Sequence, residues 1–468
     1  MELYRKALDH YQSDLKKVFF YSLNDEYNGE RCVQEIQQRV NRLKRSEIES
    51  IALNIPNSID WIFWYIAADC ACKNIYLISS DFSGSLVENI ILNYQIDGLV
   101  SLEDNNVCFK RANKNIKNSF LDTQKRLDII FTSGTTGLPK GVVIKEESFF
   151  HVANELIKET KQTFDDLELL SMPMDRSFGL ARLRTCLISG CSAVVTDGLK
   201  DFPSIFGFSR NIPITGLSLV PSALQVIILQ LRKKAKLFTE NIKYFELGSS
   251  SLIDGQEEWI KENFKDKIVI HHYGMTECSR AFLKRLDIER NLIKNYVGFP
   301  LNGLEFKINY QNDNVKEGGE LLLKGKNLFL SYLNKGDTDL KFENGWFKTG
   351  DICFEENGNI FLIGRSDNQI NIGGAKVQAE KVEKIFESIN HIEECTCFEV
   401  TDKIFGSNIA VLVRLSKDIT NLKNEVDQAF NGLPAYYRPR RIKIVDSIPK
   451  TFNGKKQRDK NILTELLE

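Results

Sequence analysis

The stretch that decides how this chain is organised reads Phe131-Thr132-Ser133-Gly134-Thr135-Thr136-Gly137-Leu138-Pro139-Lys140-Gly141-Val142. Apolar runs at 127–131 and 142–144 flank it and predict a strand on each side. The glycines let backbone N–H groups turn toward an anion, and the hydroxyl side chains add donors. Lys140 adds a positive charge that suits phosphate. The stretch therefore predicts a loop that wraps a polyphosphate, and the alternative is an ordinary polar surface loop.

The spacing differs from that of the common nucleotide P-loop, in which a helix follows the lysine, because here a strand follows it. The loop instead resembles the phosphate-binding signature of the adenylate-forming superfamily. That superfamily contains acyl-CoA synthetases, aryl-acid and amino-acid adenylating domains and luciferase. The resemblance implies an α/β fold, with a large N-terminal multi-sheet domain and a small, mobile C-terminal α+β lid.

Length and charge limit the remaining possibilities. A chain of 468 residues is too long for one ordinary core, so we expect two or more domains. A net charge of −1 gives no overall field that would recruit nucleic acid or an anionic membrane. The most apolar region, 51–78, is interrupted by Pro56, Asp60 and Asp69, which argues against a membrane span.

The ten cysteines are scattered along the chain. The close pairs Cys70/Cys72 and Cys395/Cys397 have neither zinc nor redox spacing. With no secretory signal at the N-terminus, we expect free thiols and a cytoplasmic location.

Before the loop, the chain predicts helices and then a parallel unit. Residues 1 to about 50 are expected to be helical, with helical apolar spacing across Gly29–Arg45. A strand then begins at Ile51, Ser58 caps a helix over 59–71, and a second strand covers 75–78. Strand, helix and strand at this spacing predict a βαβ unit.

A second motif follows the buried strand signal at 268–270. The stretch His271-His272-Tyr273-Gly274-Met275-Thr276-Glu277 matches the superfamily's aromatic-Gly-x-Thr-Glu pattern. The resemblance implies that Tyr273 stacks on adenine, Gly274 removes bulk beside the nucleotide, and Thr276 donates to the α-phosphate. Glu277 is the implied Mg²⁺ ligand, since Mg²⁺ prefers oxygen donors. Adjacent strand residues face opposite ways, so His271 and His272 are expected to be structural.

Three further motifs continue the resemblance toward the C-terminus. Asp351, in the sequence Thr349-Gly350-Asp351, is the implied ribose ligand, and Arg365 is expected to contact ribose or phosphate. Asp367 is the implied hinge between domains 1–366 and 367–468. Lys455 matches the lysine that bridges the attacking carboxylate and the α-phosphate, where a positioned ammonium stabilises accumulating negative charge.

The acid pocket is less clear from the residues. Asp175-Arg176 occupies the segment where relatives enter that pocket. Arg176 can pair with a carboxylate of the substrate, or Asp175 can hold an amine. The two side chains can also pair with each other or face solvent. The polar turn Gly248-Ser249 favours a small or polar acyl group.

Together these motifs predict an ATP- and Mg²⁺-dependent acid–thiol ligase. A small-molecule carboxylic acid would attack the α-phosphate to give acyl-AMP and pyrophosphate, and a thiol would then displace AMP. That thiol belongs to CoA or to the phosphopantetheine of a carrier protein acting in trans. The alternatives are an amino-acid adenylating enzyme that loads a carrier protein, and a non-catalytic nucleotide-binding relative. No nucleic acid and no membrane span are expected.

Overall fold

The structure is a computed structural model. It describes residues 2–72, 74–112, 126–132, 139–200, 202–231, 234–252, 255–288, 295–310, 318–372, 375–402, 406–417, 421–431, 433, 437–450 and 456–467. The chain divides into two compact units. Unit 1 comprises 1–305 and 324–345, and unit 2 comprises 306–323 and 346–468.

The first sheet of unit 1 has nine strands in the order β15-β14-β13-β12-β11-β9-β10-β1-β2. From β1 to β13 the neighbouring strands run parallel, whereas β2, β14 and β15 are antiparallel to their neighbours. The strands are β1 (Val18–Tyr21), β2 (Glu26–Asn28), β9 (Leu167–Leu170), β10 (Ser192–Val195), β11 (Gly216–Leu219), β12 (Tyr244–Leu247), β13 (Ile268–Met275), β14 (Cys278–Arg285) and β15 (Phe299–Pro300).

The second sheet of unit 1 has seven strands in the order β18-β8-β7-β4-β3-β5-β6. The β3–β4 pair is parallel, which confirms the predicted βαβ unit. The strands are β3 (Ser50–Asn54), β4 (Asn74–Leu77), β5 (Gly98–Glu103), β6 (Asn106–Arg111), β7 (Leu127–Thr132), β8 (Lys140–Lys145) and β18 (Ser331–Tyr332).

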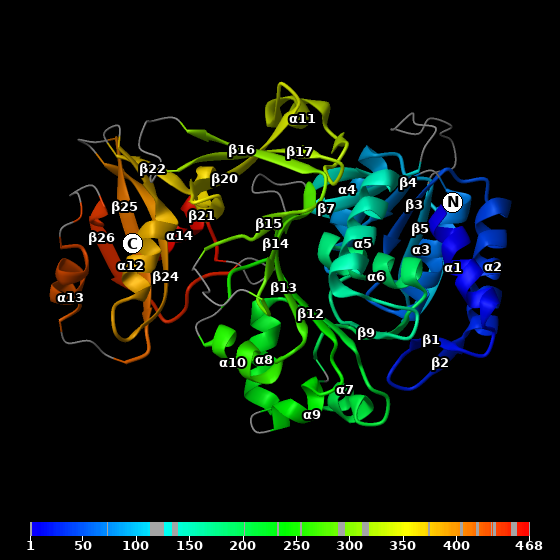
Figure 1. Ribbon diagram of the computed structural model, residues 1–468. Coiled ribbons are helices and arrows are strands. Elements are labelled where there is room, and N and C mark those ends of the chain that lie inside the picture. Colours follow the sequence, from blue (N-terminus) through cyan, green and yellow to red (C-terminus); the bar gives the residue numbers. More distant parts are fainter. Residues whose placement is uncertain are drawn as a thin grey trace. The chain divides into compact units, whose positions relative to one another are not determined.

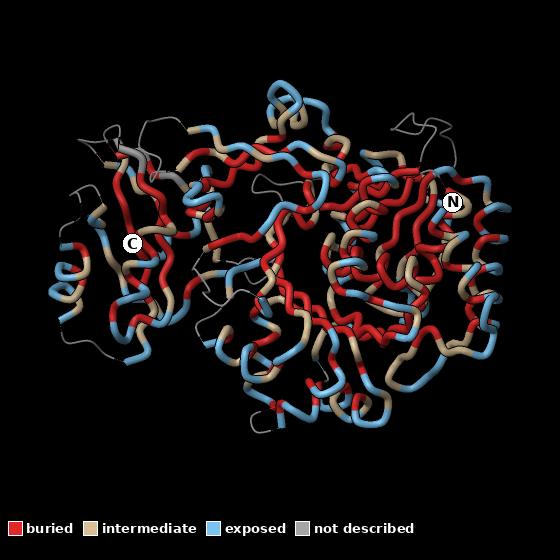
Figure 2. Tube along the Cα trace, viewed as in Figure 1, coloured by how far each residue is buried: buried red, intermediate tan, exposed pale blue. Residues whose placement is uncertain are grey.

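Two of the helices, α5 and α6, lie against each other between the two sheets, and α7 to α10 cover the outer face of the first sheet near β11 and β12 (Figure 1). The strands β9, β11 and β12 of the first sheet, which these helices cover, are buried along most of their length (Figure 2). The helices of unit 1 are α1 (Glu2–Ser13), α2 (Gly29–Arg45), α3 (Ile59–Ala71), α4 (Gly84–Asn93), α5 (Glu146–Thr160), α6 (Ser177–Ser189), α7 (Phe202–Ser209), α8 (Pro221–Leu231), α9 (Ala235–Thr239), α10 (Gln256–Asn263) and α11 (Lys335–Lys341).

The N-terminal segment is only partly as predicted. Helix α2 has the predicted bounds, and Ser58 caps α3 by accepting a hydrogen bond from the backbone of Trp61. The expectation that residues 1–50 are helical throughout is wrong, because β1 and β2 lie between α1 and α2. The apolar β1 pairs in parallel with β10, and Phe19 and Phe20 are fully buried there. Burial in a distant sheet therefore outweighs the helical tendency of the neighbouring sequence.

Unit 2 contains an antiparallel β-structure followed by a smaller α/β part. Strands β17, β20 and β21 pair antiparallel, and β16 borders β17. Strands β24 and β25 pair antiparallel, and β26 runs parallel to β25. The elements not yet given are β16 (Leu304–Tyr310), β17 (Gly319–Gly325), β19 (Phe342–Glu343, within the unit 1 segment 324–345), β20 (Trp346–Glu356), β21 (Asn359–Arg365), a 3₁₀ turn (Ser366–Asn368), β22 (Gln369–Ile372), β23 (Ala375–Gln378), α12 (Ala379–Glu387), β24 (Ile392–Asp402), β25 (Gly406–Leu415), α13 (Leu422–Ala429), β26 (Arg441–Ile444) and α14 (Lys460–Leu467).

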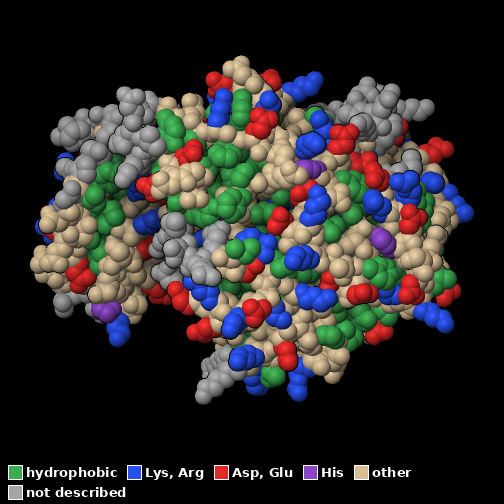
Figure 3. Space-filling view, viewed as in Figure 1, with side chains coloured by type: hydrophobic (Ala, Val, Ile, Leu, Met, Phe, Trp, Pro, Cys, Tyr) green, Lys and Arg blue, Asp and Glu red, His purple; other side chains and the backbone are tan. Residues whose placement is uncertain are grey.

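The surface carries both signs of charge. On the face shown in Figure 3, basic and acidic side chains are interspersed, which agrees with the net charge of −1. Within the described ranges, every helix is too short or too polar to cross a membrane. All ten cysteines are free thiols.

Candidate active site

The base of the predicted phosphate loop is a strand pair in unit 1. Thr132 ends β7 opposite Lys140, the first residue of β8, and its hydroxyl donates to the Lys140 carbonyl at 3.3 Å. The Lys140 side chain is 38% exposed, and its Nζ lies 3.5 Å from Asp337 Oδ1. Ser133, Gly134, Thr135, Thr136 and Gly137 fall outside the described residues. The two described ends nevertheless place a partly exposed lysine where the loop returns to the sheet.

Thr276 and Glu277 form the turn between β13 and β14. The Tyr332 hydroxyl donates to Glu277 Oε1 at 2.7 Å, and the Phe329 backbone donates to the Glu277 carbonyl at 2.8 Å. Lys140 Nζ lies 5.6 Å from the centre of the Tyr332 ring. The structure thus brings the predicted phosphate lysine and the predicted metal carboxylate to the same tyrosine.

Tyr273 and Gly274, which lie in β13 shortly before this turn, are fixed by the hairpin. Tyr273 pairs with Phe282 across β13 and β14, with ring centres 5.9 Å apart. A Cβ on Gly274 would lie 2.6 Å from the backbone nitrogen of Arg280, so the hairpin itself requires glycine there. Stacking of Tyr273 on adenine stays a prediction.

On the acid side, Arg176 lies next to the start of the phosphate loop. Its Nη1 donates to the Phe131 carbonyl at 3.2 Å, one residue before Thr132. Its Nε lies 3.8 Å from Asp175 Oδ1. Asp175 is buried, and burial raises the pKa of this carboxyl although the Arg176 guanidinium opposes the shift. The two residues therefore contact each other, and Arg176 also reaches the loop.

Gly248 and Ser249 form a tight turn after β12. A Cβ on Gly248 would lie 2.0 Å from the His272 ring, so glycine makes room for this histidine. Ser249 has a left-handed φ of 73°. His271 contacts the Ser250 carbonyl at 2.9 Å, whereas His272 Nδ1 lies 2.7 Å from Glu246 Oε1. The two histidines thus have separate protein partners, which supports their structural role.

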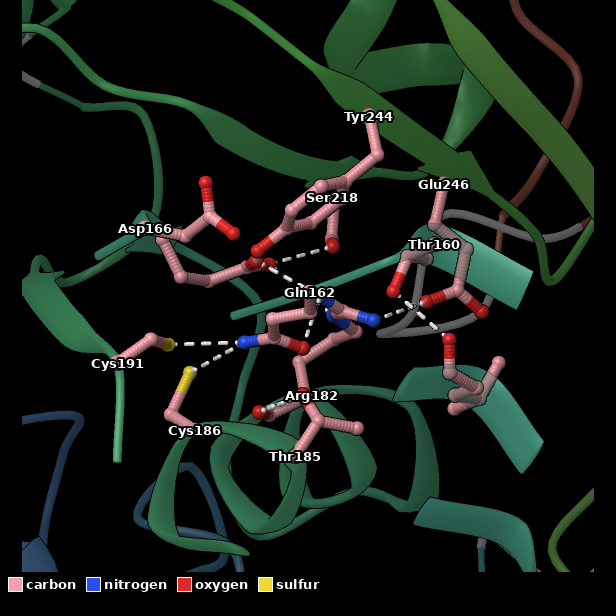
Figure 4. Close-up of polar contacts among 12 residues, drawn as sticks. Thr160, Gln162, Asp166, Arg182, Thr185, Cys186, Cys191, Ser218, Tyr244 and Glu246 are labelled. Atoms are coloured by element: carbon pink, nitrogen blue, oxygen red, sulfur yellow. Dashed lines mark hydrogen bonds and ion pairs between the residues drawn. The ribbon is translucent and has the colours of Figure 1, made fainter. Parts of the chain in front are cut away.

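A buried polar network surrounds Arg182 in unit 1 (Figure 4). Arg182 of α6 binds Glu168 Oε2 at 2.7 Å and lies 3.5 Å from Glu246 Oε2. Arg280 also binds Glu246, at 2.9 Å, and Tyr244 donates to Glu168 at 2.6 Å. Burial raises the pKa of Glu246, but Arg280 and then His272 outweigh burial and hold the pKa below its usual value. Glu246 is therefore buried as a paired anion.

Unit 2 contains the predicted ribose ligand. Asp351 Oδ1 lies 3.0 Å from Arg365 Nη1, and the same guanidinium donates to the Thr349 carbonyl at 3.3 Å. Gly350, which lies between Thr349 and Asp351, has a φ of 75°, a backbone conformation that favours glycine. Binding of ribose by Asp351, and of ribose or phosphate by Arg365, stays a prediction. The backbone of Asp367 lies in the 3₁₀ turn that follows β21, and Lys455 falls outside the described residues.

The residues present are suitable for Mg²⁺ bound mainly through a nucleotide. The described part of the chain has no group of three or more His, Cys, Asp or Glu placed around a metal. Glu277 offers one carboxylate with an oxygen oriented by Tyr332. Mg²⁺ is commonly held by one or two carboxylates together with substrate phosphates, so a single carboxylate fits that mode.

Sequence reasoning missed several of these partners. The contact of Tyr332 with Glu277 has no local signal, because the two residues are far apart in the sequence. Glu168 and Glu246 could have been found, because each is a single acid within an apolar strand and a buried charge requires a partner.

Comparison with known proteins defines the class. The family model for the AMP-binding enzyme matches residues 65–333, and the model for the AMP-binding enzyme C-terminal domain matches residues 381–455. The chain belongs to the AMP-binding enzyme family, which confirms the resemblance found in the sequence. It is an ATP-dependent, acyl-adenylate-forming acid–thiol ligase.

Two curated relatives with similar sequences are 2-succinylbenzoate–CoA ligases. A 2-succinylbenzoate–CoA ligase of Enterococcus faecalis is 29% identical over 339 residues, which cover 71% of this chain and 68% of the relative. One of Staphylococcus aureus is 27% identical over 415 residues, which cover 87% of this chain and 82% of the relative.

Solved structures share the fold. ATP-bound MatB of Rhodopseudomonas palustris superposes with a TM-score of 0.82 at 20% identity, covering 99% of this chain and 98% of that one. The o-succinylbenzoate CoA synthetase MenE of Bacillus subtilis, in complex with the acyl-adenylate intermediate OSB-AMP, gives 0.77 at 20% identity, covering 97% of each chain. The predicted fold class is confirmed.

Proposed function

We propose that this enzyme activates a carboxylic acid that carries a second carboxylate, and that it transfers the acyl group to CoA. The first candidate acid is 2-succinylbenzoate, since the curated relatives are ligases of that acid. The observation that carries the proposal is the hydrogen bond from Arg176 to the Phe131 carbonyl, which puts a guanidinium at the start of the phosphate loop. A guanidinium binds a carboxylate with two parallel hydrogen bonds.

The nucleotide would be held by the two ends of unit 1's loop and by the hairpin turn. Residues 132–137 and Lys140 would bind the phosphates, Thr276 the α-phosphate, and Tyr273 with Gly274 the adenine side. Mg²⁺ on Glu277 would neutralise phosphate charge and make the α-phosphate more electrophilic. In unit 2, Asp351 would accept the ribose hydroxyls and Arg365 would hold Asp351 in place.

Lys455 would act as the catalytic cation between the attacking carboxylate and the α-phosphate. A positioned ammonium lowers the barrier because negative charge accumulates between two anions. We also propose that domains 1–366 and 367–468 rotate about Asp367 between adenylation and thioester formation. The free cysteines suit a reducing cytoplasm.

Asp175 favours the dicarboxylate proposal over an amino-acid substrate. The carboxyl is buried, and Arg176 is its neighbour at 3.8 Å. An aspartate that holds a substrate ammonium has to meet it without a competing guanidinium. The polar turn at Gly248 and Ser249 agrees with a polar acyl group.

The test is acid-dependent exchange of pyrophosphate into ATP with a panel of dicarboxylic, monocarboxylic and amino acids. We expect exchange with 2-succinylbenzoate, loss of it in Lys455→Ala by about 10²-fold or more, and a weaker signal in Glu277→Ala. Lys450→Ala is the control, because Lys450 is a nearby exposed lysine paired with Glu394 at 3.1 Å.

Acceptors are then compared after adenylation, with CoA against a pantetheinylated carrier protein. Thioester formation on CoA supports the proposal, and transfer to the carrier alone contradicts it. If none of the acids in the panel supports pyrophosphate exchange, the non-catalytic alternative is left.

A further inference from the structure

The side chain of Tyr332 contacts both predicted ATP-binding motifs of unit 1. Its hydroxyl donates to Glu277 Oε1 at 2.7 Å, and its ring centre lies 5.6 Å from Lys140 Nζ. The residue is 5% exposed, so a hydrogen bond there is little weakened by water.

Three contacts fix the position of Tyr332. Strand β18 pairs antiparallel with β8, so that Tyr332 lies opposite Val142, two residues after Lys140. The Tyr332 backbone donates to Thr338 Oγ1 at 2.9 Å. The Phe329 ring packs on the Tyr332 ring with centres 4.9 Å apart. The tyrosine is therefore held by the sheet that carries the phosphate loop.

The turn that carries Glu277 is tied to the same segment. The Phe329 N–H group donates to the Glu277 carbonyl, and the backbones of Cys278 and Leu328 form an isolated antiparallel β-bridge. The backbone of the turn is thus fixed by residues 328–329, while its carboxylate is oriented by Tyr332. Backbone and side chain of Glu277 have different partners on one short segment.

We propose that Tyr332 is the positioning residue for the metal-binding carboxylate, and that it sets how tightly the enzyme binds divalent metal together with ATP. The inference rests on the proposed role of Glu277. The hydroxyl fixes one carboxylate oxygen, so the other is presented in one orientation. Removing a group that orients a metal ligand typically weakens metal binding by about 10- to 100-fold.

The ring and the hydroxyl have separable effects. Tyr332→Phe removes only the hydrogen bond to Glu277 and keeps the ring beside Lys140. Tyr332→Leu removes both, so it also withdraws the aromatic face from the lysine ammonium. We expect Tyr332→Phe to weaken metal binding alone, and Tyr332→Leu to weaken metal-free ATP binding as well.

The experiment measures binding rather than turnover. Mn²⁺ is titrated into the full-length protein with ATP, and bound metal is followed by electron paramagnetic resonance. ATP binding without metal is measured by calorimetry. We expect the Mn²⁺ dissociation constant to rise about 10- to 100-fold in Tyr332→Phe, with metal-free ATP affinity within about twofold of wild type.

Tyr244→Phe is the matched control, because Tyr244 donates to Glu168 at 2.6 Å in the buried network. It removes a Tyr–Glu hydrogen bond outside the proposed site and should leave Mn²⁺ binding unchanged. Thr338→Val removes the acceptor for the Tyr332 backbone and should weaken Mn²⁺ binding less than Tyr332→Phe does.

Wild-type Mn²⁺ affinity in Tyr332→Phe would overturn the proposal, as would an equal loss in Tyr244→Phe, which would indicate general loosening. A wild-type protein that does not bind Mn²⁺ with ATP would overturn it too. If the wild-type protein binds Mn²⁺ and ATP but shows no pyrophosphate exchange with any acid, the proposed function is refuted. The comparison of the variants would still decide the role of Tyr332.

Discussion

Arg182 and Arg184 lie two residues apart on α6 and bind acidic side chains of different sheets. Arg182 binds Glu168 of β9, and Arg184 binds Asp128 of β7. Residues two apart on a helix point about 200° away from each other, so one helix between two sheets can reach both. The two ion pairs connect α6 to both sheets of unit 1, and Arg176 lies at its N-terminal end.

The first prediction concerns stability. Arg182→Met leaves Glu168 and Glu246 buried with less compensation, and breaking a buried pair by removing one partner costs about 3–5 kcal/mol. We expect a clearly lower urea midpoint, measured by tryptophan fluorescence.

The control for this prediction is Lys200→Ala, which removes an exposed pair with Asp197 and should leave the midpoint unchanged. An unchanged midpoint in Arg182→Met would show that the ion pairs of Arg182 do not stabilise the packing of α6 on the first sheet.

The second prediction concerns acid selectivity. Arg176→Met should lower kcat/KM for a dicarboxylic acid about 10- to 100-fold, the equivalent of about 1.5–3 kcal/mol for a hydrogen bond to a charged group. A monocarboxylic acid of the same shape should lose much less, since it has no second carboxylate. Steady-state kinetics with both acids measure the difference.

Arg176→Lys is the informative companion, because a lysine keeps the charge without the paired donors and should give an intermediate loss. Equal losses for both acids would show that Arg176 only positions the loop through the Phe131 carbonyl.

The third prediction concerns ribose. Asp351→Asn replaces an acceptor for two hydroxyl protons and loosens the contact with Arg365, so the KM for ATP should rise about tenfold. With an ATP analogue that lacks a ribose hydroxyl, wild type and variant should differ less. Equal ratios for the two nucleotides would place Asp351 outside the ribose contact.

The fourth prediction concerns pH. Burial lowers the pKa of His271 from 6.5 to about 4, although the contact with the Ser250 carbonyl opposes the shift. Between those values the unfolded chain binds a proton that the folded chain does not, so stability is present above pH 6.5 and is lost as pH falls toward 4. The other charged groups facing this strand include Lys284, opposite His271, and the pair His272–Glu246.

His271→Gln should therefore flatten the fall of the urea midpoint between pH 6.5 and pH 4, as measured by unfolding at several pH values. An identical slope in wild type and variant would mean that another group is responsible.

Much of the architecture follows from local patterns. Ser58 predicts the start of α3, because a hydroxyl there can accept from a free N–H group, and the structure has that hydrogen bond. The strands on both sides of the phosphate loop were predicted from their apolar runs, and the structure has both of them.

Other features have no local signal. β1 is a strand because β10, far along the chain, provides its pairing partner. The partners of Arg182, Arg184 and Arg176 likewise come from distant strands. A charged residue in an apolar segment indicates that some partner exists, but only the packing of α6 between two sheets identifies it.

The sequence by itself determined the family, the order of the nucleotide motifs and several helices and strands beside them, because each depends on residues that are neighbours along the chain. The tertiary structure alone decided that Tyr332 binds Glu277 and that Arg176 reaches the Phe131 carbonyl. Those contacts join segments that are far apart in sequence, and their geometry is set by sheet pairing and burial rather than by any local pattern.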